Sequence, residues 1–561
     1  MTTTQTNDHQ ISLLVAVTGH RDIVEIDIPK IRADICAQLV NIESNTIKQN
    51  VRPILLSGLA AGGDQLVAQE ALKRNWDVFA VFPMPLSDFL EDFTSQKDRE
   101  ALMNLKAQCK QVIEIPWALS LDSDITDQRD QQYRNQSIFI VRQSQLVIAL
   151  WDGTPANLSG SCGTAYAVEL CRKGPPPVGG EVLAAPETTS LIHIPIRRQS
   201  DLKRAPIFEA NPPSTDSIYI NVCKEFGSYN KAAAKLIKTN PLKIKECADQ
   251  LIPEELMQNL DLEIHELVGQ YAVADALAQD RQTIRNRVVK VASIATILAA
   301  FAQGTNAMLS QTSWMIVYGV AAGLAYGLYL ILFKLPYYRT EDRYLEYRAL
   351  AEALRVQIFW RLAGLSEGTA EHYLQLVKSD VGWVREAARS ISLPVSINSS
   401  NGTEALEIID KFWINNQVRY FVGETPDVID GAAMKCKKKQ QQFDYSANLA
   451  MAFGVVSVVV GTVSAESICG ISPDIKAGAS AYATALFLCA GVIKAYATAM
   501  GYADQAVSYE KMGAIFQRAE RLLEQDQRRQ NECLLALGKH ALAENAEWLL
   551  QHRRSAFKIP S

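Results

Sequence analysis

The most constraining feature of this 561-residue chain is the stretch from Val291 to Phe333, which contains no Asp, Glu, Lys or Arg. Because 21% of the residues in the whole chain are charged, 43 consecutive uncharged residues differ strongly from its average composition. A helix needs ~20 apolar residues to cross the hydrocarbon core of a bilayer. The stretch therefore predicts two membrane helices, near residues 291–309 and 314–333, with a turn at Ser310–Ser313.

A second apolar pair lies further along the chain, where Tyr445–Ala465 and Ala477–Ile493 are also uncharged. It predicts membrane helices at about 445–465 and 477–497, which makes four in all. Basic residues precede both pairs, at Arg281–Lys290 and Lys435–Lys439, and the two turns are nearly free of them. By the positive-inside rule, both turns are expected outside and both termini in the cytoplasm of a multi-pass protein of the cell membrane. The alternative is a pair of buried hairpins in a large soluble core.

The two apolar pairs are followed by similar sequences. Tyr347–Arg355 follows the first pair and Tyr509–Arg518 the second, and Trp383–Arg389 and Trp548–Arg554 come later. This spacing predicts a duplicated helical unit, with a first copy over 251–400 and a second over 401–561.

Residues 11–198 have a different pattern, in which short apolar runs alternate with helical stretches. Such alternation predicts an α/β domain with a Rossmann-like parallel sheet that helices cover on both faces. We expect residues 1–10 to be disordered and 199–250, with Asn211-Pro-Pro-Ser-Thr215, to be a linker. The predicted strands are Leu13–Val17, Pro53–Leu56, Val78–Phe82, Val112–Ile115, Leu146–Leu150 and Leu191–Ile196.

The net charge, the cysteines and the N-terminal residues indicate which partners and which cellular compartment to expect. A net charge of -5 gives no sign of a nucleic-acid-binding surface. None of the ten cysteines forms a C-x-x-C pair, so we expect no metal site and a reducing compartment. The polar N-terminus lacks the plan of a signal peptide, which agrees with a cytoplasmic N-terminal domain.

Three glycine-bearing turns follow predicted strands of the N-terminal domain, and ligands of open α/β sheets bind at that edge. Glycines there let backbone N–H groups approach a phosphate, and a helix N-terminus adds a favourable dipole. A plain structural turn is an adequate explanation of each turn alone, but three at matching strand ends predict a nucleotide-type pocket. The predicted ligand-binding residues are Gly19, His20, Arg21, Ser57, Gly58, Gly62, Gly63, Asp64, Asp152, Gly153, Gly160, Gly163, Thr164 and Glu169.

Four of these side chains have expected roles. Arg21 pairs with phosphate, and Asp64 and Asp152 accept hydrogen bonds from ribose hydroxyls. Glu169 contacts the sugar or acts as an acid/base. No cofactor is expected beyond a nucleotide or a nucleotide-derived second messenger as ligand.

The motifs Thr18-Gly-His-Arg21, Ser57–Asp64, Ser144–Gly153 and Gly160-x-x-Gly-Thr164 resemble the SLOG superfamily over about residues 11–198. These are Rossmann-like domains related to the LOG phosphoribohydrolases and the SMF proteins. Residues 250–558, with Tyr347–Arg355, Phe412–Phe421 and Trp548, resemble two copies of the SLATT two-helix membrane module.

The resemblance implies a function in bacterial conflict and antiphage defence. SLOG domains there are proposed nucleotide sensors, and SLATT modules are proposed pore-forming effectors. It implies a sensor whose ligand gates membrane disruption, and it implies a homo-oligomer in the lipid bilayer. The alternatives are a membrane-tethered, phosphoribohydrolase-like enzyme with Glu169 or Asp64 as acid/base, and a membrane scaffold without a ligand.

One departure separates this chain from the LOG enzymes, which carry P-G-G-x-G-T-x-x-E. Ser159–Thr164 lacks the proline and the second glycine, and Glu169 lies two positions late, about 200° around a helix. The departure argues against N-glycosidic cleavage. Phosphate binding by Gly160, Gly163 and Thr164 remains the expectation.

Two features of the apolar stretches admit alternatives. Gly319, Gly323 and Gly327 form a small face that lets helices approach closely, either within the hairpin or between subunits. Lys494 interrupts the fourth predicted helix, where it either reaches the cytoplasmic interface or lines a pore.

Overall fold

The computed structural model divides the chain into two compact units. The first unit comprises 1–249, 253–273 and 353–401, and the second comprises 250–252, 274–352 and 402–561. The structure describes residues 9–117, 125–156, 162–178, 186–202, 216–309, 312–333, 340–372, 382–393, 403–423, 430–463, 473–525 and 529–554.

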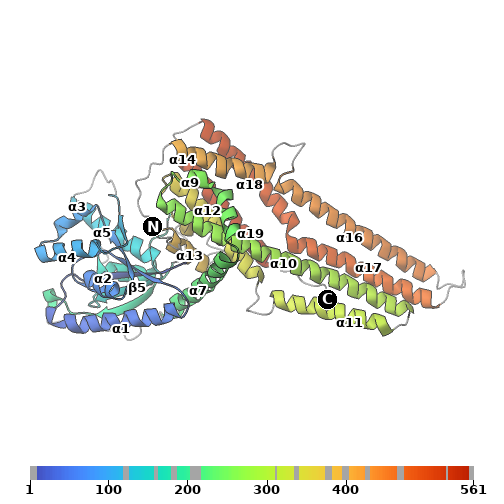
Figure 1. Ribbon diagram of the computed structural model, residues 1–561, viewed down its shortest axis with the longest axis horizontal. Helices are drawn as coiled ribbons and strands as arrows, with labels where there is room; N and C mark the ends of the chain where they lie inside the picture. The colour runs from blue at the N-terminus through green and yellow to red at the C-terminus, as the bar shows by residue number, and fades with distance from the viewer. Residues whose placement is uncertain are drawn as a thin grey trace. The chain divides into compact units, whose positions relative to one another are not determined.

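A six-stranded parallel sheet with the order β4-β3-β2-β1-β5-β6 forms the centre of the first unit. Figure 1 shows the sheet, with β5 labelled, among the helices of this unit. The Rossmann-like α/β prediction is confirmed. All six predicted strands are present within two residues at either end. They are β1 (Leu13–Gly19), β2 (Pro53–Ser57), β3 (Asp77–Phe82), β4 (Gln111–Glu114), β5 (Leu146–Trp151) and β6 (Ser190–Pro195).

The sheet has its most apolar strands in the middle. Every residue of β5 is buried, and so is every residue of β1 except Gly19. A strand without alternating polar residues is stable only where helices cover both faces of the sheet. Those helices include α1 (Ile28–Ile47), α2 (Gly63–Lys73), α3 (Leu86–Phe89), α4 (Gln96–Lys106), α5 (Ile125–Gln143) and α6 (Thr164–Lys173).

The strand order changes direction between β1 and β5. The chain builds β1 to β4 outward on one side and then returns to pair β5 with β1, in a register that sets Val15 beside Leu146. Connections on either side of such a switch point leave in opposite directions, which opens a crevice at the carboxyl ends of the two strands. The fold thereby places a potential ligand site beyond Gly19 and Trp151.

Residues 199–250 differ from the predicted linker, because they contain α7 (Asp216–Thr239) and α8 (Pro241–Leu251). Tyr219, Cys223 and Phe226 are spaced for one helix face and are almost fully buried. The side chain of Asn230 exchanges two hydrogen bonds with the backbone of Ile11, at 2.8 and 3.0 Å. This buried stripe stabilises α7 on the α/β core. The segment Asn211–Thr215 lies outside the described residues.

The unit boundaries also differ from the predicted copies over 251–400 and 401–561. Both helical pairs belong to the second unit, whereas α13 (Gly382–Ile391) belongs to the first. Two long helices, α10 (Leu262–Leu309) and α12 (Thr340–Leu362), contribute residues to both units. The short helix α9 (Glu254–Met257) precedes α10.

The second unit is helical. Beside parts of α10 and α12 it contains a π-helical turn at Ile409–Asn415, which lies between α14 and α15. Its other helices are α11 (Thr312–Phe333), α14 (Thr403–Ile408), α15 (Asn416–Val422), α16 (Ala432–Val463), α17 (Pro473–Met500), α18 (Tyr502–Gln525) and α19 (Gln530–Arg554).

Two helical segments of the described chain, not the expected four, are long and apolar enough to cross a membrane. They are Ala432–Thr462, in α16, and Gly478–Gln525, which includes most of α17. In α11 the qualifying apolar stretch is the shorter Met315–Leu328. The uncharged 291–309 segment is not an independent helix, since it is the end of α10, whose earlier part is charged. The turn residue Ser310 lies outside the described residues.

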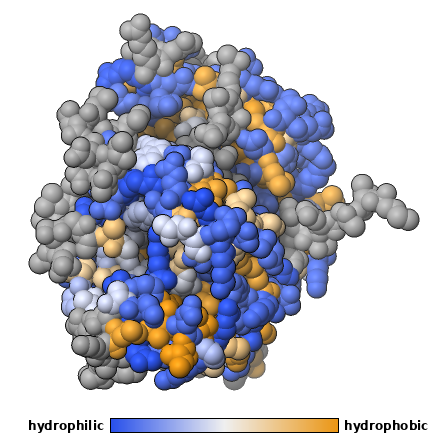
Figure 2. Space-filling model, turned by 90° about the vertical axis from the view of Figure 1, so that its left-hand side faces the viewer, coloured by the Kyte–Doolittle hydropathy of each residue, from blue (hydrophilic) through white to orange (hydrophobic). Residues whose placement is uncertain are grey.

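The apolar face of α16 is exposed. Only 11% of its most apolar window is buried inside the protein, which does not resemble the core helix of a soluble protein. The view in Figure 2 shows many hydrophilic residues with smaller hydrophobic areas between them. The exposed large side chains of α16 include Tyr445, Leu449, Met451, Phe453, Val455, Val456, Val459 and Val460.

Within the second unit, α10 packs along α17. Arg285 of α10 donates a 2.7 Å hydrogen bond to the carbonyl oxygen of Ala499, and the hydroxyls of Thr305 and Tyr482 lie 3.0 Å apart. These contacts, about five turns apart on each helix, show that α10 and α17 lie side by side at two levels. Four alanines of α10, spaced three or four residues apart, are buried: Ala292, Ala295, Ala299 and Ala302.

The glycines that meet close neighbours are not those of the predicted small face. A Cβ on Gly454 of α16 would lie 2.8 Å from the Phe487 ring of α17. For Gly319, Gly323 and Gly327 of α11, no described atom lies within 4 Å of such a Cβ. The described contacts therefore give no support to packing of this face within the hairpin. Lys494 is exposed near the end of α17.

Candidate functional site

A cavity of about 760 Å³ lies at the carboxyl ends of β1 and β5 in the first unit. Its volume is in the upper part of the range for small-molecule sites, roughly 300–1,000 Å³. Eight predicted ligand-binding residues line it: Gly19, His20, Arg21, Gly58, Asp64, Asp152, Gly163 and Thr164. The fold thus brings the three glycine-bearing turns together around one space.

The other predicted site residues have different positions. Ser57 lies behind the wall, where its hydroxyl accepts a 3.1 Å hydrogen bond from the backbone N–H of Leu59. Gly62, Gly63 and Gly153 shape the adjoining turns without lining the cavity. Gly160 lies outside the described residues. Glu169 does not line the cavity, and its carboxylate pairs with Lys173 at 2.6 Å.

Glycine is required where β1 meets the start of α2. A Cβ on Gly19 would lie 2.7 Å from Gly63 Cα, and a Cβ on Gly62 would lie 2.5 Å from the carbonyl oxygen of His20. Gly62 also has a φ of 84°, in the region that favours glycine. This close approach brings the first turn of α2, with Asp64, directly against the end of β1.

The amino end of α6 opens into the cavity. Its preceding residue, Gly163, has a φ of 90° and ψ of -155°, and no side chain caps the helix. The first N–H groups of a helix have no partner inside it. Gly163, Thr164 and Ala165 line the cavity, and no described atom lies within 4 Å of the position of a Gly163 Cβ. The arrangement suits an anionic group such as phosphate.

Asp64 is the most deeply buried charged residue of the cavity, with 7% of its surface exposed. Its Oδ1 has no hydrogen-bond partner. Burial raises its pKa to about 7, although the guanidinium of Arg21 and nearby backbone N–H groups act in the opposite direction. A buried carboxyl oxygen without a partner is costly, so Asp64 is poised to receive a hydrogen-bond donor from a ligand.

His20 and Asp152 form a second polar pair, at the switch point itself. His20 Nε2 lies 3.3 Å from Asp152 Oδ1, and Asp152 also accepts a 2.9 Å hydrogen bond from the backbone N–H of Thr154. Burial lowers the pKa of His20, although Asp152 opposes this effect. The imidazole is therefore largely neutral near pH 7. Although Asp152 lies close by, His20 Nε2 has no hydrogen-bond partner among the described residues.

Residues of α5 form the opposite wall, which the sequence analysis did not include. Tyr133 accepts a 2.9 Å hydrogen bond from Arg21, and its own hydroxyl donates to Asp92. Arg129 pairs with Asp92 at 2.8 Å. Arg129, Tyr133 and Gln136 follow the spacing of one helix face, so a polar stripe on α5 was the available signal.

Some charged side chains of the cavity form ion pairs within the protein, and others do not. Arg198 pairs with Asp22 at 2.9 Å, and Arg129 is held by Asp92. Among the described residues, Arg21 has no carboxylate within 4 Å and is exposed to the cavity. Arg21 therefore supplies a cation, Asp64 supplies an acceptor, and the α6 terminus supplies backbone donors.

The charge and hydrogen-bonding capacity of these groups would suit a polar organic anion. The described residues contain no group of three or more His, Cys, Asp or Glu that could hold a metal. A phosphate with a neighbouring sugar or base would use all three available groups. No protein-family model, no curated protein and no solved structure matches the chain, so its relationships rest on the motifs and the fold.

Proposed function

We propose that this protein is a nucleotide-sensing membrane effector, in which a ligand of the first unit gates membrane disruption by the second. The observation that carries the proposal is the cavity at the β1–β5 switch point, with an available arginine and an uncapped helix terminus. A chain that also exposes an apolar helix such as α16 joins ligand recognition to a membrane.

The cavity supports a nucleotide as ligand through complementary chemistry. A phosphate at the amino end of α6 would receive backbone hydrogen bonds and the charge of Arg21. Sugar hydroxyls would donate to the free oxygen of Asp64 or to Asp152. Asp64 Oδ1 has no hydrogen-bond partner among the described residues, and no side chain caps α6.

The membrane part of the proposal follows the SLATT resemblance. The two candidate spans would lie in the cell membrane, with both termini in the cytoplasm. Their exposed apolar side chains would face lipid or other copies in a homo-oligomer. The SLOG and SLATT assignments and a role in antiphage defence belong to this proposal.

An enzyme is the second candidate, and Asp64 is the observation that favours it. A buried carboxyl with a pKa of about 7 has the property of a general acid/base that operates near neutral pH. Glu169 is a weaker candidate because it lies outside the cavity wall and is paired with Lys173. The second function is a phosphoribohydrolase-like reaction on a bound nucleotide.

Calorimetry on the full-length protein in detergent tests the proposal, with AMP, ADP-ribose and cyclic di-AMP as probes. We expect one of them to bind and Gly163→Asp, which places a carboxylate at the phosphate position, to abolish binding. Gly368→Asp is the matched control, since it adds the same charge where no neighbour lies within 4 Å. Chromatography of the nucleotide after incubation separates the candidates, because a sensor returns it intact and an enzyme releases base. If none of the probes binds, the proposed ligand class is wrong.

A further inference from the structure

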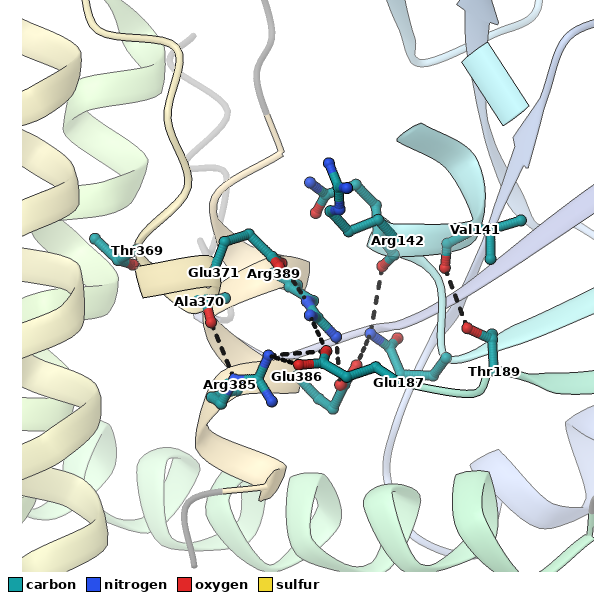
Figure 3. Close-up of polar contacts among 12 residues, drawn as sticks. Val141, Arg142, Glu187, Thr189, Thr369, Ala370, Glu371, Arg385, Glu386 and Arg389 are labelled. Atoms are coloured by element: carbon teal, nitrogen blue, oxygen red, sulfur yellow. Dashed lines mark hydrogen bonds and ion pairs between the residues drawn. The ribbon is translucent and has the colours of Figure 1, made fainter. Parts of the chain in front are cut away.

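A second cluster of charged residues lies in the first unit, away from the candidate site (Figure 3). Arg385 of α13 donates to both carboxylate oxygens of Glu187, at 2.8 and 2.9 Å, and Arg389 donates to Oε2 of Glu187 at 2.7 Å. Arg389 also pairs with Glu371 and Glu386, each at 2.8 Å. Glu187 thus links the α/β fold to a helix almost 200 residues later in the chain.

The two arginines of the network are buried and are surrounded by three carboxylates. Arg385 and Arg389 expose only 5% and 8% of their surface. Burial alone would raise the pKa of Glu187, but the two guanidinium groups hold it well below its usual range. Removal of one member of a buried ionic group leaves its partners uncompensated. Loss of these contacts therefore leaves buried arginines without a counter-charge, which favours the arrangement in which both arginines contact carboxylates.

α13 is also bonded to the edge of the sheet that lies opposite the cavity. Gln145, just before β5, accepts a 2.9 Å hydrogen bond from the backbone N–H of Leu14 and donates one of 2.9 Å to Glu386. The hydroxyl of Ser390 donates to the carbonyl oxygen of Ser12 at 2.6 Å. The amino ends of β1 and β5 are thus attached to α13, and their carboxyl ends form the candidate site.

Two helices connect the cavity with this network. α6 begins at Thr164 in the cavity wall, and the carbonyl oxygen of Cys171 near its end accepts from the N–H of Thr189, two residues after Glu187. α5 contributes Tyr133 to the cavity, and the carbonyl oxygen of Val141 near its end accepts from the hydroxyl of Thr189. A shift of either helix along its axis would move the segment that carries Glu187.

We infer that the network of Glu187, Arg385 and Arg389 is a latch that couples the cavity to α13 through α5 and α6. Arg361 of α12 donates a 3.1 Å hydrogen bond to the carbonyl oxygen of Ser392, so the latch adjoins a helix that contributes residues to both units. The idea that a ligand signal passes through this latch rests on the proposed function. The coupling itself is a property of the protein without ligand.

Hydrogen–deuterium exchange of the full-length protein in detergent tests the latch without any nucleotide. Coupled sites affect each other reciprocally. We expect Glu187→Gln to accelerate exchange in α13 and also in the cavity segments 129–140 and 163–170, by about fivefold or more. Asp64→Asn, made in the cavity, should in turn change exchange in α13. Should Glu187→Gln fail to fold, Glu187→Asp keeps the charge and shortens the reach, with the same expected pattern.

Glu43→Gln is the matched control, because Glu43 also receives two hydrogen bonds from one arginine, Arg74, in the first unit. It should leave α13 and both cavity segments unchanged. Faster exchange of α13 alone in both Glu187 variants would reduce the network to a local anchor and overturn the inference. So would an equal change at the cavity in Glu43→Gln, which would indicate general loosening. Failure of nucleotides to bind would contradict the proposed function and not the latch.

Discussion

The guanidinium carbon of Arg21 lies 5.4 Å from the centre of the Tyr133 ring, and a nitrogen of the same group donates a 2.9 Å hydrogen bond to the Tyr133 hydroxyl. The Phe93 ring is 5.9 Å away. Contacts with aromatic faces position an arginine without neutralising its charge. Arg21 is thereby oriented in the cavity and remains available for an anion.

Arg21→Ala should weaken nucleotide binding by about 10- to 100-fold, since loss of a charge-assisted hydrogen bond costs ~1.5–3 kcal/mol. Arg21→Lys should recover only part of the affinity, because an ammonium group lacks the planar fork. Tyr133→Phe keeps the ring and removes the hydroxyl, so its effect should be smaller. Calorimetry on the four proteins measures these differences. Equal affinity in Arg21→Ala and the parent would exclude this arginine from the phosphate site.

The glycines around the cavity should respond differently to alanine. Gly63→Ala places a methyl group 2.7 Å from Gly19 Cα, where backbone must move, and should lower the melting temperature. Gly163→Ala meets no neighbour within 4 Å and only forces a side chain into a backbone region that favours glycine. We expect Gly63→Ala to lower the melting temperature more than Gly163→Ala does. Gly163→Ala should have the larger loss of nucleotide affinity relative to its loss of stability. Thermal melts with matched calorimetry check the order, and a reversed order would contradict this account of the two turns.

The cavity was largely predictable from the sequence because each turn joins a buried strand to a helix. Parallel strands bring their carboxyl ends to one edge, so Gly19, Gly58 and Asp152 had to approach one another once the strands were recognised. The α5 wall was not predicted, since Tyr133 and Arg129 stand in a polar helix without a turn motif. Their position depends on how α5 packs against the sheet, which spacing alone does not determine.

The helical region was predicted less completely, for physical reasons that differ between its parts. Tyr219, Cys223 and Phe226 carry a helical stripe, but the proline-rich segment before them suggested a linker. The charge-free stretch predicted where α10 ends and where α11 begins and ends, to within two residues. It did not predict that α10 starts as early as Leu262. The Glu187–Arg389 contact joins residues 202 positions apart, and no local pattern predicts such a pair.

Asp64 should make the stability of the first unit depend on pH. Burial raises its pKa from the ordinary value of 3.8 to about 7, so the folded protein keeps a proton that the unfolded chain has lost. The stabilising contribution is fully present below about pH 4 and is lost as the pH rises through 7. Asp64→Asn removes this titration, and its melting temperature should fall less than that of the parent between pH 5 and 8. Parallel melting profiles over this range would show that Asp64 does not titrate there.

Gly323→Leu tests whether the glycine face of α11 meets another copy. No described atom lies within 4 Å of a Cβ at this position, so leucine should fit within one chain. If copies associate through this face, four added carbons should separate them and lower the oligomeric mass in detergent. Val320→Leu is the control, because Val320 is 67% exposed on the same helix. Mass photometry with unchanged oligomers in Gly323→Leu would remove the glycine face from the subunit contact.

Ligand-triggered leakage tests the central claim most directly. The full-length protein is reconstituted in phosphatidylethanolamine–phosphatidylglycerol liposomes loaded with a fluorescent dye, and the tightest-binding nucleotide of the calorimetric panel is added. The account predicts dye release that depends on nucleotide concentration, is absent in Arg21→Ala and persists in the control Gly368→Asp. Intact liposomes at saturating nucleotide, or equal release by the parent and Arg21→Ala, would contradict a ligand-gated membrane effector.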